Sequence, residues 1–318
     1  SIADGMFNAF EVSHLTTGII VAVLLALVVF GGAKRIARFS EIVVPFMAGI
    51  YILMTVVIIC LNISEVPAVL KLIFSSALSF DSTFGGIVGS AIAWGVKRGI
   101  YSNEAGQGTA PHAAAAAATS HPAKQGLVQA FSVYIDTLFV CSATAFIILF
   151  TGKYNVKNPE TVGSDKVEYI VENLPNVKEG AAFTQHAIST YFPSIGNEFI
   201  AIALFLFAFT TAMAYYFIAE SNYYYLSNYK KNPVLIWTLR FVFLASIIYG
   251  AVSEGGSIWG IGDIGVGVMA WLNIIAIILL RKPALRALKD YQEQKDKGLD
   301  PKFDPEKLDI KNTTEWKD

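Results

Sequence analysis

The feature that most constrains this chain is a series of apolar stretches long enough to cross a lipid bilayer. A helix needs roughly 20 apolar residues to span the hydrocarbon core. Lipid offers no hydrogen-bond partner to the backbone, so such stretches are expected to be helical. The sequence predicts an all-α polytopic membrane protein, with spans at residues 15–32, 42–61, 129–150, 198–218, 233–252 and 258–280.

Composition excludes several other classes of protein. Charged residues make up 15% of the 318 positions, against about 25% in soluble domains. The net charge of -1 leaves no basic surface for nucleic acid. Cys60 and Cys141 both lie in apolar runs, so neither a disulfide framework nor a paired-thiol metal site is expected.

A seventh crossing, residues 84–118, is predicted to be broken in the middle. Its apolar first part is short, and a polar, glycine-rich sequence separates it from an alanine run at 113–118. Glycine, serine and asparagine disfavour helix, whereas Thr109 followed by Pro111 is typical of a helix start. We expect one half-helix to end near Gly99 and another to begin near Thr109. The alternative is a short span followed by an ordinary cytoplasmic loop.

A broken span of this kind predicts a binding site for a small zwitterion. The first half-helix ends in free carbonyls, which suit an ammonium group or Na⁺, and the second begins with free N–H groups, which suit a carboxylate. Broken helices mark midplane substrate sites in secondary transporters.

The distribution of Lys and Arg predicts the orientation of the chain. Cytoplasmic loops collect these residues, as do the connections that hold Lys34 and Lys231. We expect an outer segment at 1–14, a membrane domain at 15–280, an extracellular loop at 151–197 and a cytoplasmic tail at 281–318. The tail is predicted to be a solvated helix followed by extended chain. The expected location is the plasma membrane, as a monomer.

Three polar residues inside predicted spans are candidate cation ligands. Thr210 and Thr211 place adjacent hydroxyls on one span, and Na⁺ prefers oxygen ligands. Helix packing is the alternative for this pair. Asp136 is an intramembrane carboxylate, which is a functional candidate by default; it is expected to bind a cation or to pair with a cationic side chain, either Arg240 or Lys97. A pairing of Glu104 with Arg98 is also expected.

Several segments carry a resemblance to a known family. The run GVKRGIYSNEAGQGTAP, followed by HPAKQGL and IDTLFVCSATAFIIL, resembles the signature of the alanine or glycine:cation symporter family. LFAFTTAMAYYFIAE and FDPEKLDIKNTTEW match the same family further along. The resemblance implies a partial leucine-transporter fold, helices four to ten of two inverted five-helix repeats, with the broken span as helix six. Because the chain starts at Ser1 without Met, we expect a fragment that lacks the N-terminal helices.

The resemblance also implies which residues form the sites. Substrate would contact Tyr101, Ala105, Gly106, Thr211 and Tyr215. Sodium would bind the hydroxyls of Thr210 and Thr211 and the carbonyl of Phe207. The family usually has Phe at the position of Tyr101 and Trp at that of Tyr215, so side-chain selectivity stays open.

The implied function is a sodium-coupled symporter that imports alanine or glycine by alternating access, with Na⁺ as coupling ion and no cofactor. The alternative is an ion or solute channel subunit, although no filter motif is visible. An intramembrane enzyme is not expected, because G-x-S-x-G and H-E-x-x-H are absent from the sequence. The G-x-G-x-x-G pattern at Gly260–Gly265 opens a membrane span and is not a dinucleotide loop.

Overall fold

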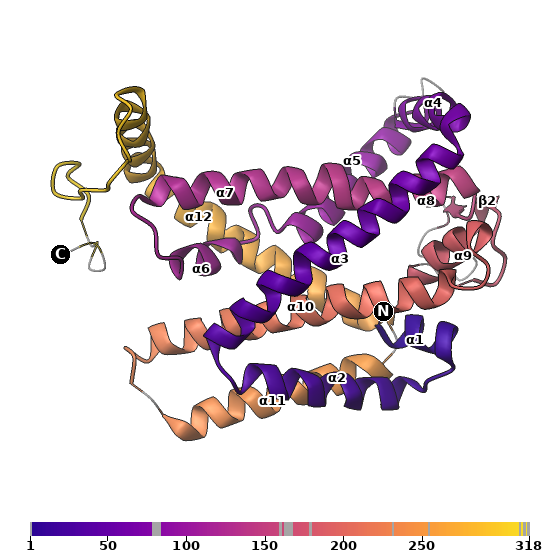
Figure 1. Ribbon diagram of the computed structural model, residues 1–318, viewed down its shortest axis with the longest axis horizontal. Helices are drawn as coiled ribbons and strands as arrows, with labels where there is room; N and C mark the ends of the chain where they lie inside the picture. The colour runs from indigo at the N-terminus through magenta and orange to yellow at the C-terminus, as the bar shows by residue number, and fades with distance from the viewer. Residues whose placement is uncertain are drawn as a thin grey trace. The chain divides into compact units, whose positions relative to one another are not determined.

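The computed structural model describes residues 2–77, 84–158, 161, 168–177, 180–230, 232–253, 255–311, 313 and 316, and most of them are helical (Figure 1). The chain divides into two compact units. Unit 1 consists of Ser1–Val96 and Phe139–Trp259, and unit 2 of Lys97–Leu138 and Gly260–Asp318.

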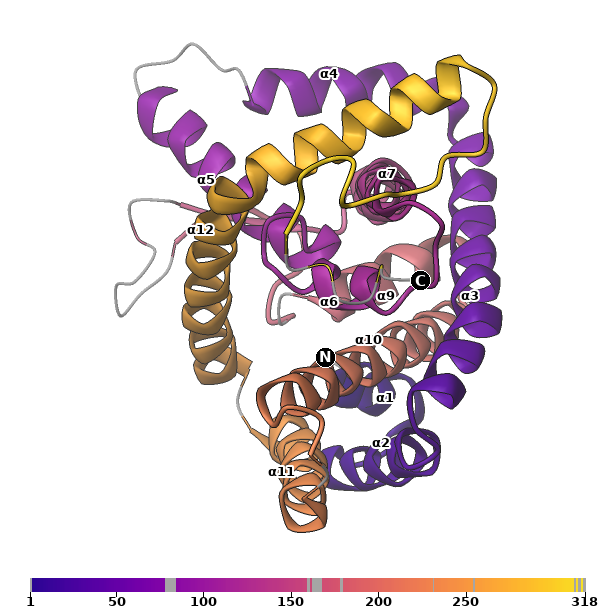
Figure 2. The same cartoon turned by 90° about the vertical axis from the view of Figure 1, so that its left-hand side faces the viewer.

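Unit 1 is built around one long helix, α10 (Gly196–Leu226), which packs against α1 (Ile2–Phe10), α3 (Ala33–Leu61) and α9 (Ala181–Tyr191). Helices α2 (His14–Val29) and α11 (Pro233–Val252) lie side by side (Figures 1 and 2). The other elements are η1 (Ile63–Glu65), α4 (Val66–Ala77), α8 (Ser142–Thr151), the antiparallel pair β1 (Asn155–Lys157) and β2 (Tyr169–Glu172), and α5 (Phe84–Asn103) up to Val96.

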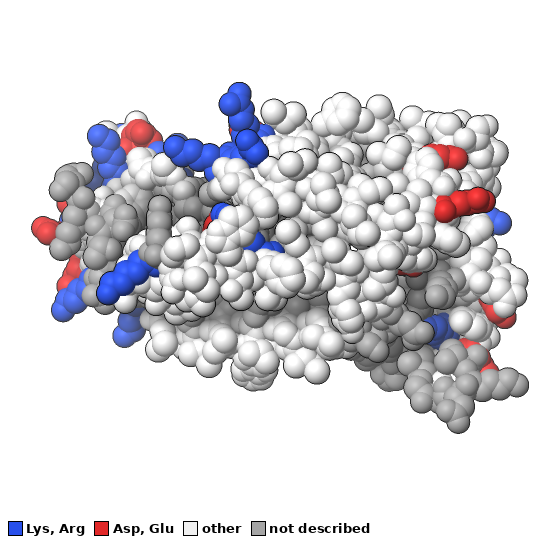
Figure 3. Space-filling model, turned by 90° about the horizontal axis from the view of Figure 1, so that it is seen from below, with Lys and Arg blue, Asp and Glu red and all other residues white. Residues whose placement is uncertain are grey.

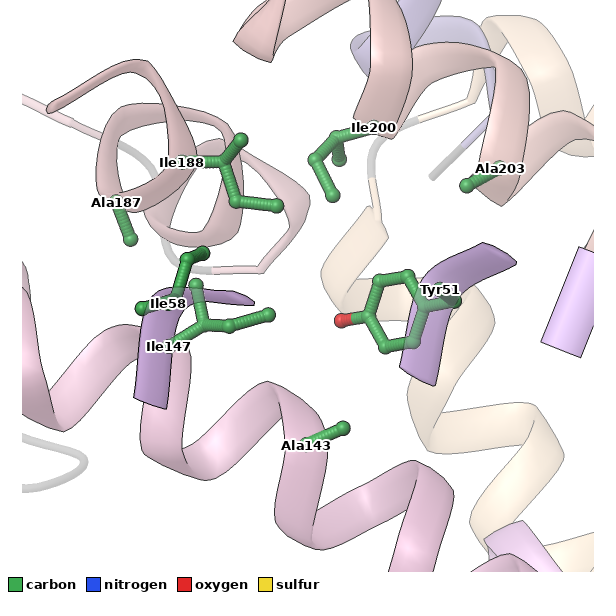
Figure 4. Close-up of a cluster of buried hydrophobic side chains, with 8 residues drawn as sticks. All are labelled: Tyr51, Ile58, Ala143, Ile147, Ala187, Ile188, Ile200 and Ala203. Atoms are coloured by element: carbon green, nitrogen blue, oxygen red, sulfur yellow. The ribbon is translucent and has the colours of Figure 1, made fainter. Parts of the chain in front are cut away.

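Two apolar clusters hold unit 1 together. The first joins α3, α8, α9 and α10 (Figure 4), and the Tyr51 hydroxyl within it forms a 2.7 Å hydrogen bond with Thr144. The second joins α2, α3 and α10 around Leu25 and Met213, both of which are fully buried. These clusters fix α10, and with it the position of the Thr210–Thr211 pair within the unit.

Unit 2 contains the end of α5, then α6 (Ala110–Ala115), α7 (Pro122–Tyr134), the π-helical segment η2 (Ile135–Cys141) as far as Leu138, and α12 (Gly255–Asp296) from Gly260 onward. Only the last two turns of α5 belong to this unit. They carry the residues that approach α12.

Five helices among the described residues are long and apolar enough to cross a membrane: Lys34–Leu61, Pro122–Thr151, Gly196–Leu226, Pro233–Val252 and Trp259–Asp296. A sixth is possible if α1 and α2, bent by 120° at their junction, form one span. The protein is therefore a multi-pass membrane protein. Seen from below, the side on which α2 and α11 lie in Figure 1, the described surface has a broad middle area without charged side chains (Figure 3).

The helix bounds differ from several of the predicted spans and connections. The first predicted span corresponds to α2, which has 16 residues, about 24 Å at 1.5 Å per residue. It ends at Val29, three residues before the predicted end, because Gly31 and Gly32 follow and Gly32 has a φ of 77°. The connection expected to hold Lys34 is helical, since α3 begins at Ala33. The predicted loop at 151–197 contains the strand pair and α9. Lys231 lies outside the described residues.

The predicted extended tail does not run free into solvent. After α12 the chain folds back onto the end of that helix and onto the connection between α6 and α7 (Figure 2). The amide of Phe303 donates to the Ser120 carbonyl at 2.9 Å, and the Ser120 hydroxyl donates to the Pro301 carbonyl at 3.0 Å. One backbone and one side-chain hydrogen bond therefore dock the tail.

His121 lies at the centre of this docked tail and is fully buried. It caps α7, because its Nδ1 accepts a hydrogen bond from the amide of Ala123 at 3.1 Å. The rings of Tyr291 and Phe303 pack against the imidazole, with centroids 5.3 and 5.4 Å away. Nε2 lies 3.5 Å from a carboxylate oxygen of Asp290.

Ion pairs surround the imidazole. Lys307 contacts the buried Asp290 at 3.1 Å, which raises the pKa of the lysine. Lys124 contacts Asp300 at 2.6 Å, and this hydrogen bond lowers the pKa of the aspartate. Burial lowers the pKa of His121 below its usual value, so the folded tail favours the neutral imidazole.

We predict that acidification weakens the docked tail through His121. Between the lowered pKa of the folded state and the ordinary histidine pKa of about 6.5, the unfolded state binds a proton that the folded state does not. Stability is thus fully present above this value and falls as pH drops below it. His121→Asn keeps an N-cap oxygen and removes the titrating group.

The measurement is the melting temperature of the purified protein at about pH 7.5 and about pH 5.5. The parent should lose more stability on acidification than His121→Asn, although the variant starts lower because the aromatic pocket is underfilled. Equal losses in the two proteins would contradict the role assigned to the imidazole.

Candidate functional site

The helix is interrupted between α5 and α6. Helix α5 continues to Asn103, one turn beyond the predicted end near Gly99, and α6 begins at Ala110. Gly106 and Gly108 have φ angles of 82° and 99°, which L side chains rarely adopt. We call residues 104–109 the break. That the interrupted segment forms a single membrane crossing stays a prediction.

Helix α6 differs from the predicted second half-helix. It has only six residues and ends at Ala115, so the alanine run is not helical throughout. Pro111 lies in its first turn, as expected. Thr109 occupies the N-cap position without capping the helix; its hydroxyl donates instead to the carboxylate of Glu104. The two ends of the break are therefore joined by this side-chain hydrogen bond.

The residues around the break are hydrogen-bonded to η2 and α12. Ser102 donates to a carboxylate oxygen of Asp136 at 2.6 Å. The amide nitrogen of Asn103 donates to Thr137 at 2.9 Å, and its oxygen accepts from the Ala105 backbone at 2.9 Å. Asp136 lies in a π-helical segment, a local irregularity that often marks functional sites.

Charged side chains form ion pairs and hydrogen bonds in both units. Lys97 pairs with Asp263 on α12, and Asp136 accepts from Ser102. In unit 1, Arg240 lies 3.7 Å from the carboxylate of Glu220. Sequence analysis could not choose among carboxylates for these cations, because each pairing joins two different helices and depends on how they pack.

Arg98 was expected to pair with Glu104. The structure places its guanidinium 5.5 Å from the centroid of the Tyr101 ring, a cation–π distance. The Tyr101 hydroxyl donates to Asp263 at 2.6 Å. The ring face and the hydroxyl of this tyrosine are thus each in contact with a charged group.

Asp263 and Asn273 are the residues of this region that sequence analysis missed. Asn273 donates to the carbonyl of Gly106 at 3.0 Å. The signal was present in the sequence, because between Gly255 and Leu280 these are the one charged residue and the one amide.

The predicted sodium ligands lie together on α10 in unit 1. The hydroxyls of Thr210 and Thr211 both donate to the carbonyl of Phe207, at 2.9 Å each. Thr210 is buried and Thr211 exposed, and Tyr215 follows one turn after Thr211. Each hydroxyl oxygen retains lone pairs for a cation. The same bonds also occur in threonines that serve only packing.

The predicted site residues therefore form two groups. Tyr101, Ala105, Gly106 and Asp136 belong to unit 2, and Phe207, Thr210, Thr211 and Tyr215 to unit 1. Ala105, Gly106 and Thr211 are exposed. Among the described residues, no cluster of three or more His, Cys, Asp or Glu could hold a metal ion.

The profile of the Sodium:alanine symporter family matches residues 1–305. The chain belongs to this family. It is 57% identical over 316 residues to the "Putative sodium/proton-dependent alanine carrier protein YrbD" of Bacillus subtilis (strain 168). It is 56% identical, also over 316 residues, to the "Sodium/proton-dependent alanine carrier protein" of Bacillus sp. (strain PS3). The family consists of symporters, not enzymes.

Both carriers align with 99% of this chain, which spans 64% of the first and 70% of the second. A more distant relative is the "Probable sodium/glutamine symporter GlnT" of Bacillus subtilis (strain 168), 42% identical over 93% of this chain and 57% of its own length. The names of these relatives thus give different amino acids as substrates, alanine in two and glutamine in the third.

We predict that Gly108 is required for the conformation of the break. A residue with a side chain at this position would have to adopt a φ of 99°, and its Cβ would lie 3.1 Å from the Cβ of Asn273. Gly108→Ala should therefore cost about 1–2 kcal/mol of unfolding free energy, seen as a melting temperature lower by a few degrees.

Gly126 supplies the matched control. It lies inside α7 in the same unit, and a Cβ there would meet nothing within 4 Å. Gly126→Ala should leave the melting temperature unchanged or raise it slightly, because alanine favours helix. A Gly108→Ala protein as stable as Gly126→Ala would contradict the prediction.

Proposed function

We propose that this protein imports alanine by symport with Na⁺ and alternating access across the plasma membrane. The observation that carries the proposal is the break between α5 and α6 in a chain of the Sodium:alanine symporter family. The names of the two alanine carriers, at 57% and 56% identity, favour alanine over glycine as substrate. Family membership also disfavours the channel alternative.

The proposed substrate site consists of Tyr101 at the end of α5, Ala105 and Gly106 in the break, and Thr211 and Tyr215 on α10. Exposure of Ala105 and Gly106 supports this role, because a ligand can approach backbone that small residues leave uncovered. Alanine and glycine need little side-chain space, which suits a site that contains tyrosines.

The proposed coupling ion is Na⁺, bound by Thr210, Thr211 and the Phe207 carbonyl. Support comes from the convergence of both hydroxyls on one carbonyl oxygen, which gathers three oxygen atoms on one turn of α10. Hard cations prefer such ligands. The names of the relatives include protons as well as sodium, and Asp136 is the second candidate ligand for a cation.

The partial leucine-transporter fold, with the break in helix six, remains part of this proposal. So do the outside location of the N-terminal end, the cytoplasmic location of the tail and the monomeric state. The charged, docked tail and the Lys and Arg of the connections support the orientation, because cytoplasmic segments collect such residues.

The function is tested by uptake of labelled alanine into proteoliposomes that contain the full-length protein. An inward sodium gradient should drive accumulation, and a proton gradient alone should not. Counterflow of labelled alanine at equal sodium concentrations separates a carrier from a channel. A carrier in vesicles loaded with unlabelled alanine accumulates the label by exchange, whereas a channel only lets the label equilibrate. Failure of unlabelled alanine to compete would contradict the proposed substrate.

The sodium site predicts a specific defect in Thr211→Val. Valine keeps the shape of threonine and deletes the oxygen, so the sodium concentration for half-maximal uptake should rise about tenfold, as for loss of a contact with a charged group. The maximal rate at saturating sodium should change less.

Thr238→Val is the matched control. Thr238 on α11 is also exposed, and its hydroxyl donates to the carbonyl four residues earlier at 2.9 Å, as that of Thr211 does. This control should leave sodium dependence unchanged. Identical sodium curves for both variants would exclude a coordinating role for Thr211.

A further inference from the structure

Helix α12 brings one carboxylate and one amide to α5 and the break. Asp263 is the one charged residue between Gly255 and Leu280, and Asn273 the one amide. A carboxylate in an apolar helix is costly unless it is paired and hydrogen-bonded. The partners of Asp263 therefore indicate why it is tolerated there.

Both oxygens of Asp263 contact the end of α5. Oδ1 accepts the hydrogen bond from the Tyr101 hydroxyl at 2.6 Å, and Oδ2 pairs with the ammonium of Lys97. Lys97 and Tyr101 are four residues apart and so lie on one face of α5. A single carboxylate thus connects α12 to the last two turns before the break.

These contacts fix the direction of the Tyr101 ring. Its hydroxyl is held by an ionised acceptor, and such hydrogen bonds are roughly twice as strong as neutral ones. Its face lies 5.5 Å from the Arg98 guanidinium. A ring held at the hydroxyl and covered on one face has little freedom to rotate. Phenylalanine at this position would lack the hydroxyl and therefore the contact with Asp263.

We propose that Asp263 is a positioning residue for alanine: through the Tyr101 hydroxyl it holds the aromatic ring in the orientation that meets the substrate. Lys97 supports this role, because its positive charge stabilises the ionised carboxylate. The inference rests on the proposed function, in which Tyr101 contacts alanine. Asp263 itself does not touch the substrate.

Alanine uptake by full-length protein in proteoliposomes tests the role, with rates normalised to the amount reconstituted. Asp263→Leu removes the acceptor for the hydroxyl, and Tyr101→Phe removes the donor. Each should raise KM for alanine about tenfold, as for loss of one charge-assisted hydrogen bond, with a smaller change in the maximal rate. A purely structural defect would lower the maximal rate instead.

The double variant decides whether the two residues act through one contact. Asp263→Leu combined with Tyr101→Phe should have the KM of the more affected single variant, because both remove the same hydrogen bond. Asp263→Asn, which keeps an oxygen acceptor, should be less impaired than Asp263→Leu. Trp271→Phe is the control, since Trp271 lies on the same helix and is 70% exposed.

Melting temperatures of the parent, Asp263→Leu, Tyr101→Phe and the double variant give a readout that does not require transport. The combined loss in Asp263→Leu/Tyr101→Phe should be smaller than the sum of the single losses. Additive losses would overturn the contact. Coupled losses with unchanged KM in an active parent would overturn the positioning role.

The proposed function can fail separately. A parent protein without sodium-driven alanine uptake would remove it, and with it the role in alanine binding, even where the melting temperatures show the contact. If Asp263→Leu does not fold, Tyr101→Phe alone still decides, because an unchanged KM in that variant overturns the inference.

Discussion

Hydrocarbon offers no hydrogen-bond partner to a peptide group, and a helix that is interrupted in a membrane protein must satisfy its polar groups through other elements. The break at residues 104–109 imposes this constraint on unit 2. The Asn273 side chain donates to the carbonyl of Gly106, and that of Asn103 accepts from the backbone amide of Ala105. The Thr109 hydroxyl donates to Glu104 across the break. The polar residues of otherwise apolar elements therefore gather where backbone leaves the helix.

The interactions described in the two units are of different kinds. Apolar clusters in unit 1 hold a long uninterrupted α10, whose hydroxyl pair stays bonded to its own helix. Unit 2 relies on hydrogen bonds and ion pairs, from the contacts of Asp263 to those of His121 beneath the docked tail. Helix α12 takes part in both of these polar groups. A charge change on this helix should thus affect the break or the tail more than the apolar packing.

Sequence reasoning predicted where helices exist better than where they end. Residues 233–252 match α11 at both ends, because Asn232 and Pro233 form a strong N-terminal signal. The end of α5 was placed one turn too early, since the preference of Gly99 against helix is about 1 kcal/mol, while Lys97 and Tyr101 on the same face gain contacts with Asp263. Local propensity cannot anticipate a gain that comes from another helix.

The sequence by itself determined the class of protein, the family and the existence of the break, because apolar run length and glycine or proline spacing act locally along the chain. Only the tertiary structure decided the partners: Asp136 with Ser102, Lys97 with Asp263, and His121 with Asp290. The physical reason is that a carboxylate can accept from many different cations and hydrogen-bond donors. Which pair forms depends on which helices lie side by side, and that is set by packing across more than a hundred residues of chain in two of these three pairs.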